Sequence, residues 1–299
     1  MPSTTWPTPS VTLPTVPELE DINLYLEKLS PQEVLLWGLR HLPNLYQSTA
    51  FGITGLCTTH MLTTFPTSAF PEPSNPQVPM IFVDTLYHFQ ETLELKDEVE
   101  KKYNVPVIVA KPQDCETVAD FEAKHGERLW ERNEPTYDFL VKVDPARRIY
   151  EKLAVKSLLT GRRRSQGAAR AKLSPLEIDE TGMFKLNPLF SWSLEQVQTY
   201  LDENDVPKNK LLSQGYKSVG DWHSTTKSKE GEGERDGRWR GREEKTECGL
   251  HEDYFKLKLL AKKQKREEEL RRRDEAQDKL QGSFASLEIS EKTATETTA

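Results

Sequence analysis

The sequence predicts an α/β protein with a doubly wound, mostly parallel sheet. Short apolar runs of the kind found in buried strands alternate with amphipathic helical patterns between residues 45 and 160. A glycine-containing turn joins the first of these runs directly to a helix. Strands that alternate with helices build a parallel sheet covered on both faces. In such a sheet we expect a ligand at the carboxyl ends of the strands.

The individual elements follow from periodicity and from capping residues. Ser30, Pro31 and Glu33 form the start signal of a helix, and Ser193 with Gln196 forms another. We expect helices at residues 18–29, 31–42, from the glycine turn through residue 62, 89–103, 117–125, 145–153 and 193–204. We expect strands at residues 45–51, 78–83, 105–110 and 155–160, with extended pieces at 175–179 and 184–189.

Composition divides the chain into four parts. Residues 1–17 form a Pro/Thr-rich leader that we expect to be disordered, and residues 18–224 form the compact α/β domain. Residues 225–253 begin with a charged, glycine-rich stretch that has too few apolar side chains to fold on its own, so we expect a mobile segment. We expect residues 254–299 to form a charged helical extension and a disordered tail.

The charge and the cysteine count exclude several classes of protein. With 41 basic and 48 acidic residues the net charge is -7, which argues against a broad surface for nucleic acid or an anionic membrane. The sequence has no apolar run of about 18 residues and no signal-peptide pattern, so we expect a cytoplasmic protein. Three cysteines without a Cys-x-x-Cys pair supply neither a disulfide framework nor the four thiolates of a usual iron–sulfur cluster. The histidines lack metal-binding spacing, and we expect no metal site.

One cysteine lies among positive charges. Cys248 stands near His251 and follows an arginine-rich run that contains Arg235 and Arg238. A thiol reacts as its thiolate, which nearby positive charge stabilises, and guanidinium groups match the oxygens of phosphate and sulfate. The segment therefore suggests thiol chemistry on an anion. The alternative is a solvated basic tail with an incidental cysteine.

Four further segments contain residues suited to an anionic ligand. The turn at residues 51–55 can aim backbone N–H groups at a phosphate, although a plain tight turn fits equally well, and it matches neither a Walker loop nor a dinucleotide fingerprint. Residues 84–85 follow a strand and can either approach a ligand or cap a helix. Residues 162–166 and 217–224 gather charged side chains, with solvated surface segments as the alternative.

Seven motifs in order resemble those of the phosphoadenylyl-sulfate reductase family, in the form found in fungi. They are residues 49–56, 82–89, 111–116, 159–167, 215–225, 234–239 and 245–251, and the resemblance covers residues 30–255. The chain departs from the fungal pattern at a few positions. His60 stands where a carboxylate is common, Gln90 replaces a proline, and residues 243–244 lengthen the approach to the cysteine motif.

The resemblance implies an adenine nucleotide α-hydrolase-like, Rossmann-like fold for the nucleotide-binding domain. It also implies a two-step reaction in assimilatory sulfate reduction, towards cysteine and methionine. Cys248 attacks the sulfur of 3'-phosphoadenylyl sulfate (PAPS), adenosine 3',5'-bisphosphate leaves, and reduced thioredoxin then releases sulfite from the S-sulfocysteine. The family is commonly homodimeric and needs no bound cofactor.

The residues and the resemblance together give the candidate site. Cys248 is the nucleophile, and Arg235, Arg238 and His251 resemble residues that contact the phosphosulfate. The candidates for substrate binding are Phe51, Gly52, Thr54, Gly55, Asp84, Thr85, Arg162, Arg163, Arg164, Ser165, Gln166, Lys217, Asp221 and His223, with Lys156 as a weaker one. Relatives that use the substrate without its 3'-phosphate carry a four-cysteine cluster, so three cysteines favour PAPS.

Two other functions are compatible with this fold. The first is the ATP-using subunit of a sulfate adenylyltransferase, which would lack the Cys248 motif. The second is a non-catalytic nucleotide-binding regulator whose charged helix at residues 254–280 docks a partner. Release of sulfite in the presence of reduced thioredoxin and substrate distinguishes the enzyme from a protein that only binds.

Overall fold

The computed structural model describes residues 13–65, 78–240 and Arg266. The chain divides into two compact units, Met1–Glu252 and Asp253–Ala299. Of the second unit only Arg266 is described, as an exposed helical residue. No helix of the described residues is long and apolar enough to cross a membrane.

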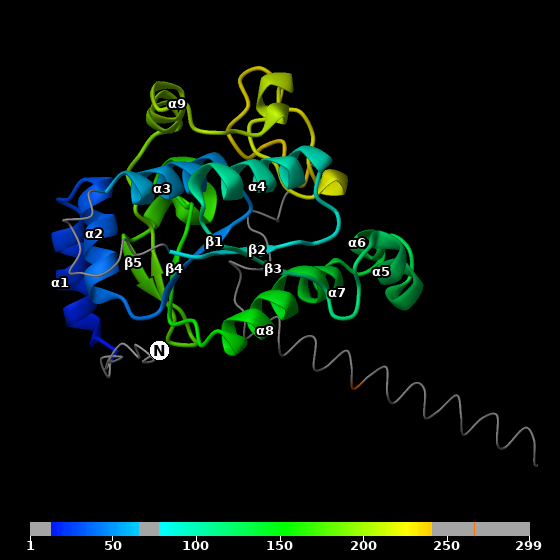
Figure 1. The fold of residues 1–299 in the computed structure, drawn as a ribbon, viewed down its shortest axis with the longest axis horizontal. Helices are drawn as coiled ribbons and strands as arrows, with labels where there is room; N and C mark the ends of the chain where they lie inside the picture. The colour runs from blue at the N-terminus through cyan, green and yellow to red at the C-terminus, as the bar shows by residue number, and fades with distance from the viewer. Residues whose placement is uncertain (1–12, 66–77, 241–265, 267–299) are drawn as a thin grey trace, which may run out of the picture. The chain divides into compact units, whose positions relative to one another are not determined.

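A six-stranded sheet forms the centre of the first unit (Figure 1). Its strands are β1 (Leu45–Thr49), β2 (Met80–Val83), β3 (Val107–Ala110), β4 (Ser157–Leu159), β5 (Leu176–Ile178) and β6 (Phe184–Leu186), in the order β3-β2-β1-β4-β6-β5. All neighbouring strands run parallel except β5 and β6. The chain builds outward from β1 to β3 and then returns to the other side of β1, so the switch point lies between β1 and β4. The predicted fold class is confirmed.

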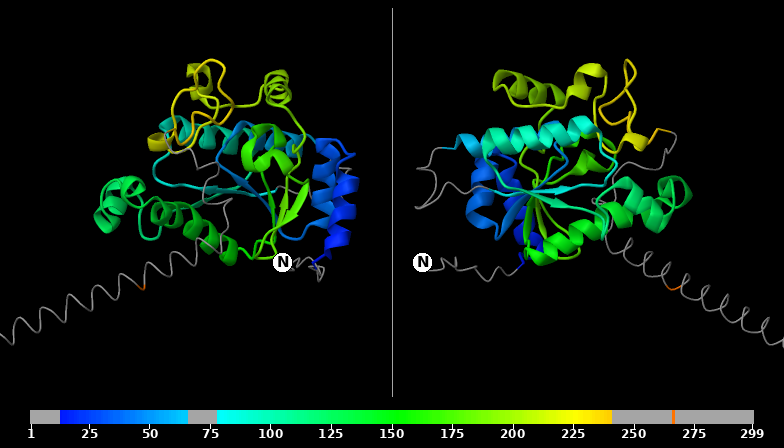
Figure 2. Two further views of the ribbon diagram at one scale, coloured as in Figure 1. Left: turned by 180° about the vertical axis from the view of Figure 1, so that it is seen from behind. Right: turned by 45° about the vertical axis from the view of Figure 1, so that its right-hand side comes forward.

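Helices cover both faces of this sheet (Figures 1 and 2). One face is packed by α1 (Val16–Leu26), α2 (Pro31–His41), α3 (Ile53–Thr64), α4 (Gln90–Tyr103) and α9 (Leu194–Glu203). The opposite face is packed by α8 (Asp144–Lys152). The alternation of side chains along a strand explains this division, because Met80 and Phe82 of β2 contribute to the first layer while Ile81 contacts the layer of α8.

The capping residues seen in the sequence fix the helix starts. The Ser30 backbone N–H donates to Glu33 Oε2 over 2.7 Å, and the Ser193 backbone N–H donates to Gln196 Oε1 over 2.8 Å. The strands are one to three residues shorter at their ends than the apolar runs that predicted them. The structure also contains elements that the sequence did not predict, namely α6 (Leu129–Arg132), α7 (Glu134–Asp138) and a π-helix (Phe139–Val143), which follow α5 (Val118–His125).

Removal of one core side chain should measure how tightly α2 packs on the sheet. Leu186 of β6 is fully buried, and a Cβ at Gly38 of α2 would lie 2.4 Å from its Cδ2 atom. Leu186→Ala should therefore lower the free energy of unfolding by about 2–5 kcal/mol, as read from urea denaturation. Leu24→Ala is the control, since Leu24 is 62% exposed and its loss should change stability by about 0.5 kcal/mol or less. Equal losses in the two variants would contradict this packing.

Candidate functional site

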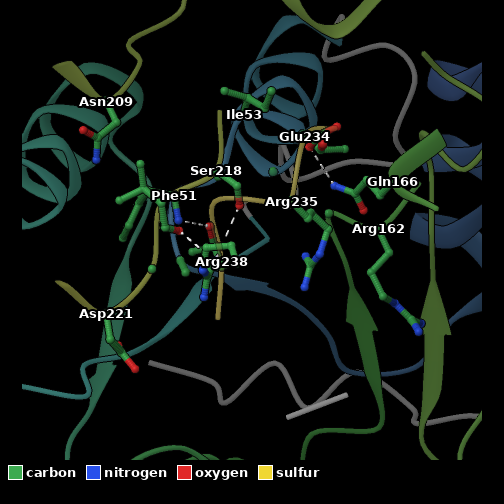
Figure 3. A pocket seen from close by; sticks show the side chains of 18 of the residues that line it. Phe51, Ile53, Arg162, Gln166, Asn209, Ser218, Asp221, Glu234, Arg235 and Arg238 are labelled. Carbon is green, nitrogen blue, oxygen red and sulfur yellow. Dashed lines mark hydrogen bonds between the residues drawn. The ribbon is translucent and has the colours of Figure 1, made fainter. Parts of the chain in front are cut away.

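A pocket of about 220 Å³ lies at the carboxyl ends of β1, β2 and β4 (Figure 3). Its lining comes from the β1–α3 turn, the segments after β2 and β4, the π-helix, and the segments 209–221 and 234–239. Because β1 and β4 flank the switch point, the sheet opens here and leaves room for a ligand.

The turn from β1 into α3 presents backbone donors to this pocket. Phe51 has a φ of 55°, in the left-handed region that side chains rarely adopt, and its N–H donates to Thr49 Oγ1 over 2.9 Å. The first helical hydrogen bond of α3 runs from Leu56 N–H to Gly52 O. Helix geometry therefore leaves the N–H groups of residues 53–55 without acceptors inside the helix, at its positive end. Such a turn is suited to bind an anion.

Two glycines allow the walls of the pocket to approach each other. A Cβ at Gly161, just after β4, would lie 3.1 Å from the backbone nitrogen of Gly55. A Cβ at Gly220 would lie 2.1 Å from Arg238 Nη2. Glycine at these positions brings the β4 loop against the start of α3 and lets the Arg238 guanidinium lie against the backbone at residue 220.

A buried cluster of one lysine and two aspartates forms another wall of the pocket. Lys142 lies on the π-helix and lines the pocket, and its Nζ is 2.6 Å from Asp138 Oδ1 and 3.0 Å from Asp221 Oδ2. Asp221 also accepts a hydrogen bond of 2.6 Å from Thr85 Oγ1. Burial disfavours the charged form of Asp221, but the Lys142 ammonium, nearby histidines and the Thr85 hydroxyl outweigh it and hold the pKa of this carboxyl well below its usual range. Asp221 is therefore an anion that fixes Lys142.

Two arginines and a tryptophan come from the segment that follows. The Arg235 and Arg238 guanidiniums lie 5.1 Å and 4.7 Å from the ring centroid of Trp239, which is buried. Arg238 Nη1 donates to Val219 O over 3.3 Å. Both arginines, which the sequence analysis assigned to contacts with the phosphosulfate, line the pocket (Figure 3).

The structure separates the three consecutive arginines after β4. Arg162 lines the pocket and pairs with Glu177, whereas the Arg163 guanidinium is fully buried against Glu234 and Arg164 pairs with Glu27. The sequence led us to expect that a bound anion neutralises all three. The structure differs, because the protein's own carboxylates neutralise them and neither Arg163 nor Arg164 lines the pocket.

The remaining candidates divide in the same way. Those that line the pocket are Phe51, Gly52, Thr54, Gly55, Thr85, Arg162, Gln166, Lys217, Asp221, Arg235 and Arg238. Those that do not are Asp84, Arg163, Arg164, Ser165 and His223. Cys248 and His251 lie outside the described residues.

The side chains that do not line the pocket have other partners. Asp84 Oδ1 accepts from the Leu86 N–H over 2.9 Å, which is the capping alternative recognised in the sequence. His223 stacks on the Trp130 ring at 4.3 Å, behind Asp221. Lys156 lies just before β4, at the amino end of that strand, away from the edge where the pocket opens.

Sequence analysis did not identify Lys142, Arg170 or Asn209, which also line the pocket. Lys142 falls in the stretch 126–144, where the sequence predicted no element. The usable signal was the Asp138–Lys142 spacing of four residues, which places two opposite charges on one helical face. Among the residues that the structure describes, no group of three or more histidines, cysteines or carboxylates is arranged to hold a metal ion.

Replacement of Asp221 by asparagine should reveal how much the buried ion pair between Lys142 and Asp221 contributes to stability. Lys142 would keep Asp138 but lose its second carboxylate, so the free energy of unfolding at pH 7 should fall by about 3 kcal/mol. The depressed pKa of Asp221 stabilises the native state above the unfolded value of about 3.9, and this contribution is lost as the pH falls below that value. The difference between wild type and variant in urea unfolding should therefore narrow from about pH 4 to pH 3.

Asp202→Asn is the matched control, because Asp202 is 62% exposed in its surface pair with Lys208. Its effect should stay within about 1 kcal/mol at every pH. If Asp221→Asn lowers the free energy of unfolding by the same amount at every pH, the charge of the Asp221 carboxylate is not what stabilises this wall of the pocket.

Comparison with known proteins agrees with this geometry. The model of the phosphoadenosine phosphosulfate reductase domain matches residues 44–227. A phosphoadenosine phosphosulfate reductase of Emericella nidulans is 50% identical over 258 residues, which cover 85% of this chain and 82% of that protein. A reductase of the same name from Saccharomyces cerevisiae is 50% identical over 242 residues, 79% of this chain and 90% of that protein.

A solved structure supports the same assignment. The crystal structure of phosphoadenylyl-sulfate reductase from Candida auris, in a phosphate complex, superimposes with a TM-score of 0.65 at 44% identity and covers 73% of this chain and 100% of that one. The resemblance found in the sequence is thereby confirmed. The chain belongs to the phosphoadenosine phosphosulfate reductase family and is an enzyme, an oxidoreductase that acts on a sulfur group.

Proposed function

We propose that this enzyme reduces PAPS to sulfite and adenosine 3',5'-bisphosphate, with reduced thioredoxin as electron donor and Cys248 as the nucleophile. The observation that carries the proposal is the pocket at the switch point, which is lined both by the first turn of α3 and by the cations Lys142, Arg235 and Arg238. Backbone donors and fixed cations of this kind suit a phosphosulfate. The pathway is the assimilation of sulfate towards cysteine and methionine.

The reaction proceeds in two displacements. The Cys248 thiolate attacks the sulfur of the sulfonyl group, the bond from that sulfur to the phosphate oxygen breaks, and adenosine 3',5'-bisphosphate leaves with the electron pair. A thioredoxin thiolate then attacks the Cys248 sulfur, and sulfite leaves with the pair of the S–S bond. The second thioredoxin thiol resolves the mixed disulfide, which returns Cys248 as a thiol and oxidises thioredoxin.

Each group of the pocket has a place in this scheme. The N–H groups of residues 53–55 and the cations Lys142, Arg235 and Arg238 lower the repulsion between a thiolate and the phosphosulfate. Asp221 and Asp138 hold Lys142 in place rather than contact the anion. We assign His251 to the phosphosulfate as well, on the basis of its motif. The homodimer and the cytoplasmic location stay predictions.

The other two cysteines are poor nucleophiles. Burial raises the pKa of Cys57 to about 12, and burial also raises the pKa of Cys115. Both thiols are almost completely buried in apolar clusters. This leaves Cys248 as the thiol that can react.

Single replacements of the three cysteines test the nucleophile. Cys248→Ala should lower sulfite release by more than about 10³-fold and leave binding of adenosine 3',5'-bisphosphate nearly unchanged, because the thiol acts only in the chemical step. Cys57→Ala and Cys115→Ala are the controls and should stay active. Sulfite is measured with reduced thioredoxin and PAPS, and substantial turnover by Cys248→Ala would refute the assignment.

Comparison of two substrates tests the nucleotide specificity. Adenylyl sulfate, which lacks the 3'-phosphate, should be used with a kcat/KM about 10- to 150-fold lower than that of PAPS, the equivalent of one charged hydrogen bond. Equal kcat/KM values, or an iron–sulfur absorption band in the purified enzyme, would contradict the proposed substrate. If no sulfite is released from either compound while both nucleotides bind, the protein is a nucleotide-binding regulator instead.

A further inference from the structure

Arg163 is the most deeply buried cation among the described residues, with an exposed fraction of 0%. Four hydrogen bonds hold its guanidinium within the protein. Nε donates to Thr54 Oγ1 over 2.8 Å, Nη1 donates to Ser165 Oγ over 2.6 Å and to the Trp192 carbonyl over 3.3 Å, and Nη2 donates to Glu234 Oε2 over 2.5 Å. Arg163 does not line the pocket, and these four bonds direct its guanidinium to groups of the protein.

The partners of Arg163 belong to different walls of the site. Thr54 lies in the first turn of α3, which offers its N–H groups to the pocket. Glu234 belongs to a different segment of the lining, next to Arg235 and four residues before Arg238. The Glu234 side chain is 8% exposed and also accepts from Gln166 Nε2 over 3.1 Å (Figure 3). The pair therefore joins the anion-binding turn to the segment that carries the two arginines.

Several other contacts of this segment run within it or to the neighbouring segment 209–221. Thr226 N–H donates to Gly237 O over 2.8 Å within the segment itself, and Arg240 pairs with Glu232, also within it. Ser228 N–H donates to Gly215 O over 2.9 Å, towards the segment 209–221 on the same side of the pocket. Few apolar side chains are available to fix residues 225–240, so polar contacts must do so.

We propose that Arg163 and Glu234 form a positioning pair, which holds Arg235 and Arg238 opposite the N-terminus of α3 and does not itself contact the substrate. The inference rests on the function proposed above for this pocket. It replaces the expectation that Arg163 contacts a phosphate. Removal of one partner leaves the other as an uncompensated buried charge, whereas removal of both leaves neutral groups, so the two residues act as a unit.

The direction in which Glu234→Gln changes the affinity for the nucleotide separates a positioning role from a purely electrostatic one. Glu234 is a carboxylate in the lining of a pocket for a polyanion, so by charge alone its neutralisation should tighten binding. A positioning role predicts the opposite, because Arg235 and Arg238 lose their place. Glu234→Gln should weaken binding of adenosine 3',5'-bisphosphate about tenfold in calorimetry on the full-length enzyme, and raise hydrogen exchange of residues 225–240 in the free protein.

The coupling between the partners is the second measurement. Arg163→Gln should weaken binding as Glu234→Gln does, and the double variant should bind better than the weaker of the two single variants. A direct phosphate contact by Arg163 predicts instead that Arg163→Gln weakens binding while Glu234→Gln alone tightens it, so the two single variants change affinity in opposite directions. Glu232→Gln is the matched control, since this carboxylate lies on the same segment but pairs with Arg240 outside the pocket lining, and it should leave affinity unchanged.

A second variant at residue 234 and the hydrogen-exchange measurement complete the test. Should Glu234→Gln not fold, Glu234→Asp keeps the charge, shortens the reach to Arg163 by one methylene, and should weaken binding in the same direction. Tighter or unchanged binding, or unchanged exchange of residues 225–240, would overturn the positioning pair. Hydrogen exchange needs no turnover, so an enzyme that releases no sulfite would refute the proposed function while the exchange data still decide the role of the pair.

Discussion

The guanidinium of Arg163 is the contact through which the walls of the pocket are held at fixed distances. A buried charge is costly unless its hydrogen bonds are satisfied, and here Thr54, Ser165, the Trp192 carbonyl and Glu234 satisfy it. These partners come from the first turn of α3, from the loop after β4, from the approach to α9 and from the segment before Arg235. Loss of the Glu234 carboxylate or of the Thr54 hydroxyl would remove an acceptor from this fully buried guanidinium, so the segments that carry them are held relative to each other. The network gives a pocket for a mobile, highly charged ligand the rigidity that its irregular backbone lacks.

Carboxylates of the protein also hold two other cations of the site in place. The protein carries a net charge of -7, so its attraction for an anion has to be local. Lys142 is held by Asp138 and Asp221, and Arg162 by Glu177. Each carboxylate weakens the positive field of its partner but fixes where that partner lies. Donors fixed in advance need little rearrangement when charge develops, and this is how a preorganised site stabilises a transition state. The depressed pKa of Asp221 keeps this arrangement charged throughout the neutral range.

The sheet, the capped helices and the anion-binding turn could be predicted from the sequence because each depends on residues that are neighbours in the chain. Apolar runs identified the strands, Ser30 and Ser193 marked helix starts, and the glycines at 52 and 55 marked the turn. The carboxylates with which Arg163 and Arg164 pair could not be predicted. Arg163 and Glu234 are 71 residues apart, and Arg164 and Glu27 are 137 apart, so no local pattern indicates that these charges pair. The stretch that contains Lys142 was missed because a π-helix and two short helices lack a sustained helical period.

The position of Cys248 in the chain completes the connection between this pocket and the chemistry. Trp239 lines the pocket, and its backbone N–H donates a hydrogen bond to Ser224 O over 2.9 Å. Cys248 follows nine residues later, and an extended chain of that length reaches at most about 30 Å. Cys57 and Cys115, in contrast, are almost completely buried, and their raised pKa values disfavour the thiolate. In the proposed reaction, walls held by buried ion pairs bind the phosphosulfate, and Cys248 meets first this substrate and then the external reductant.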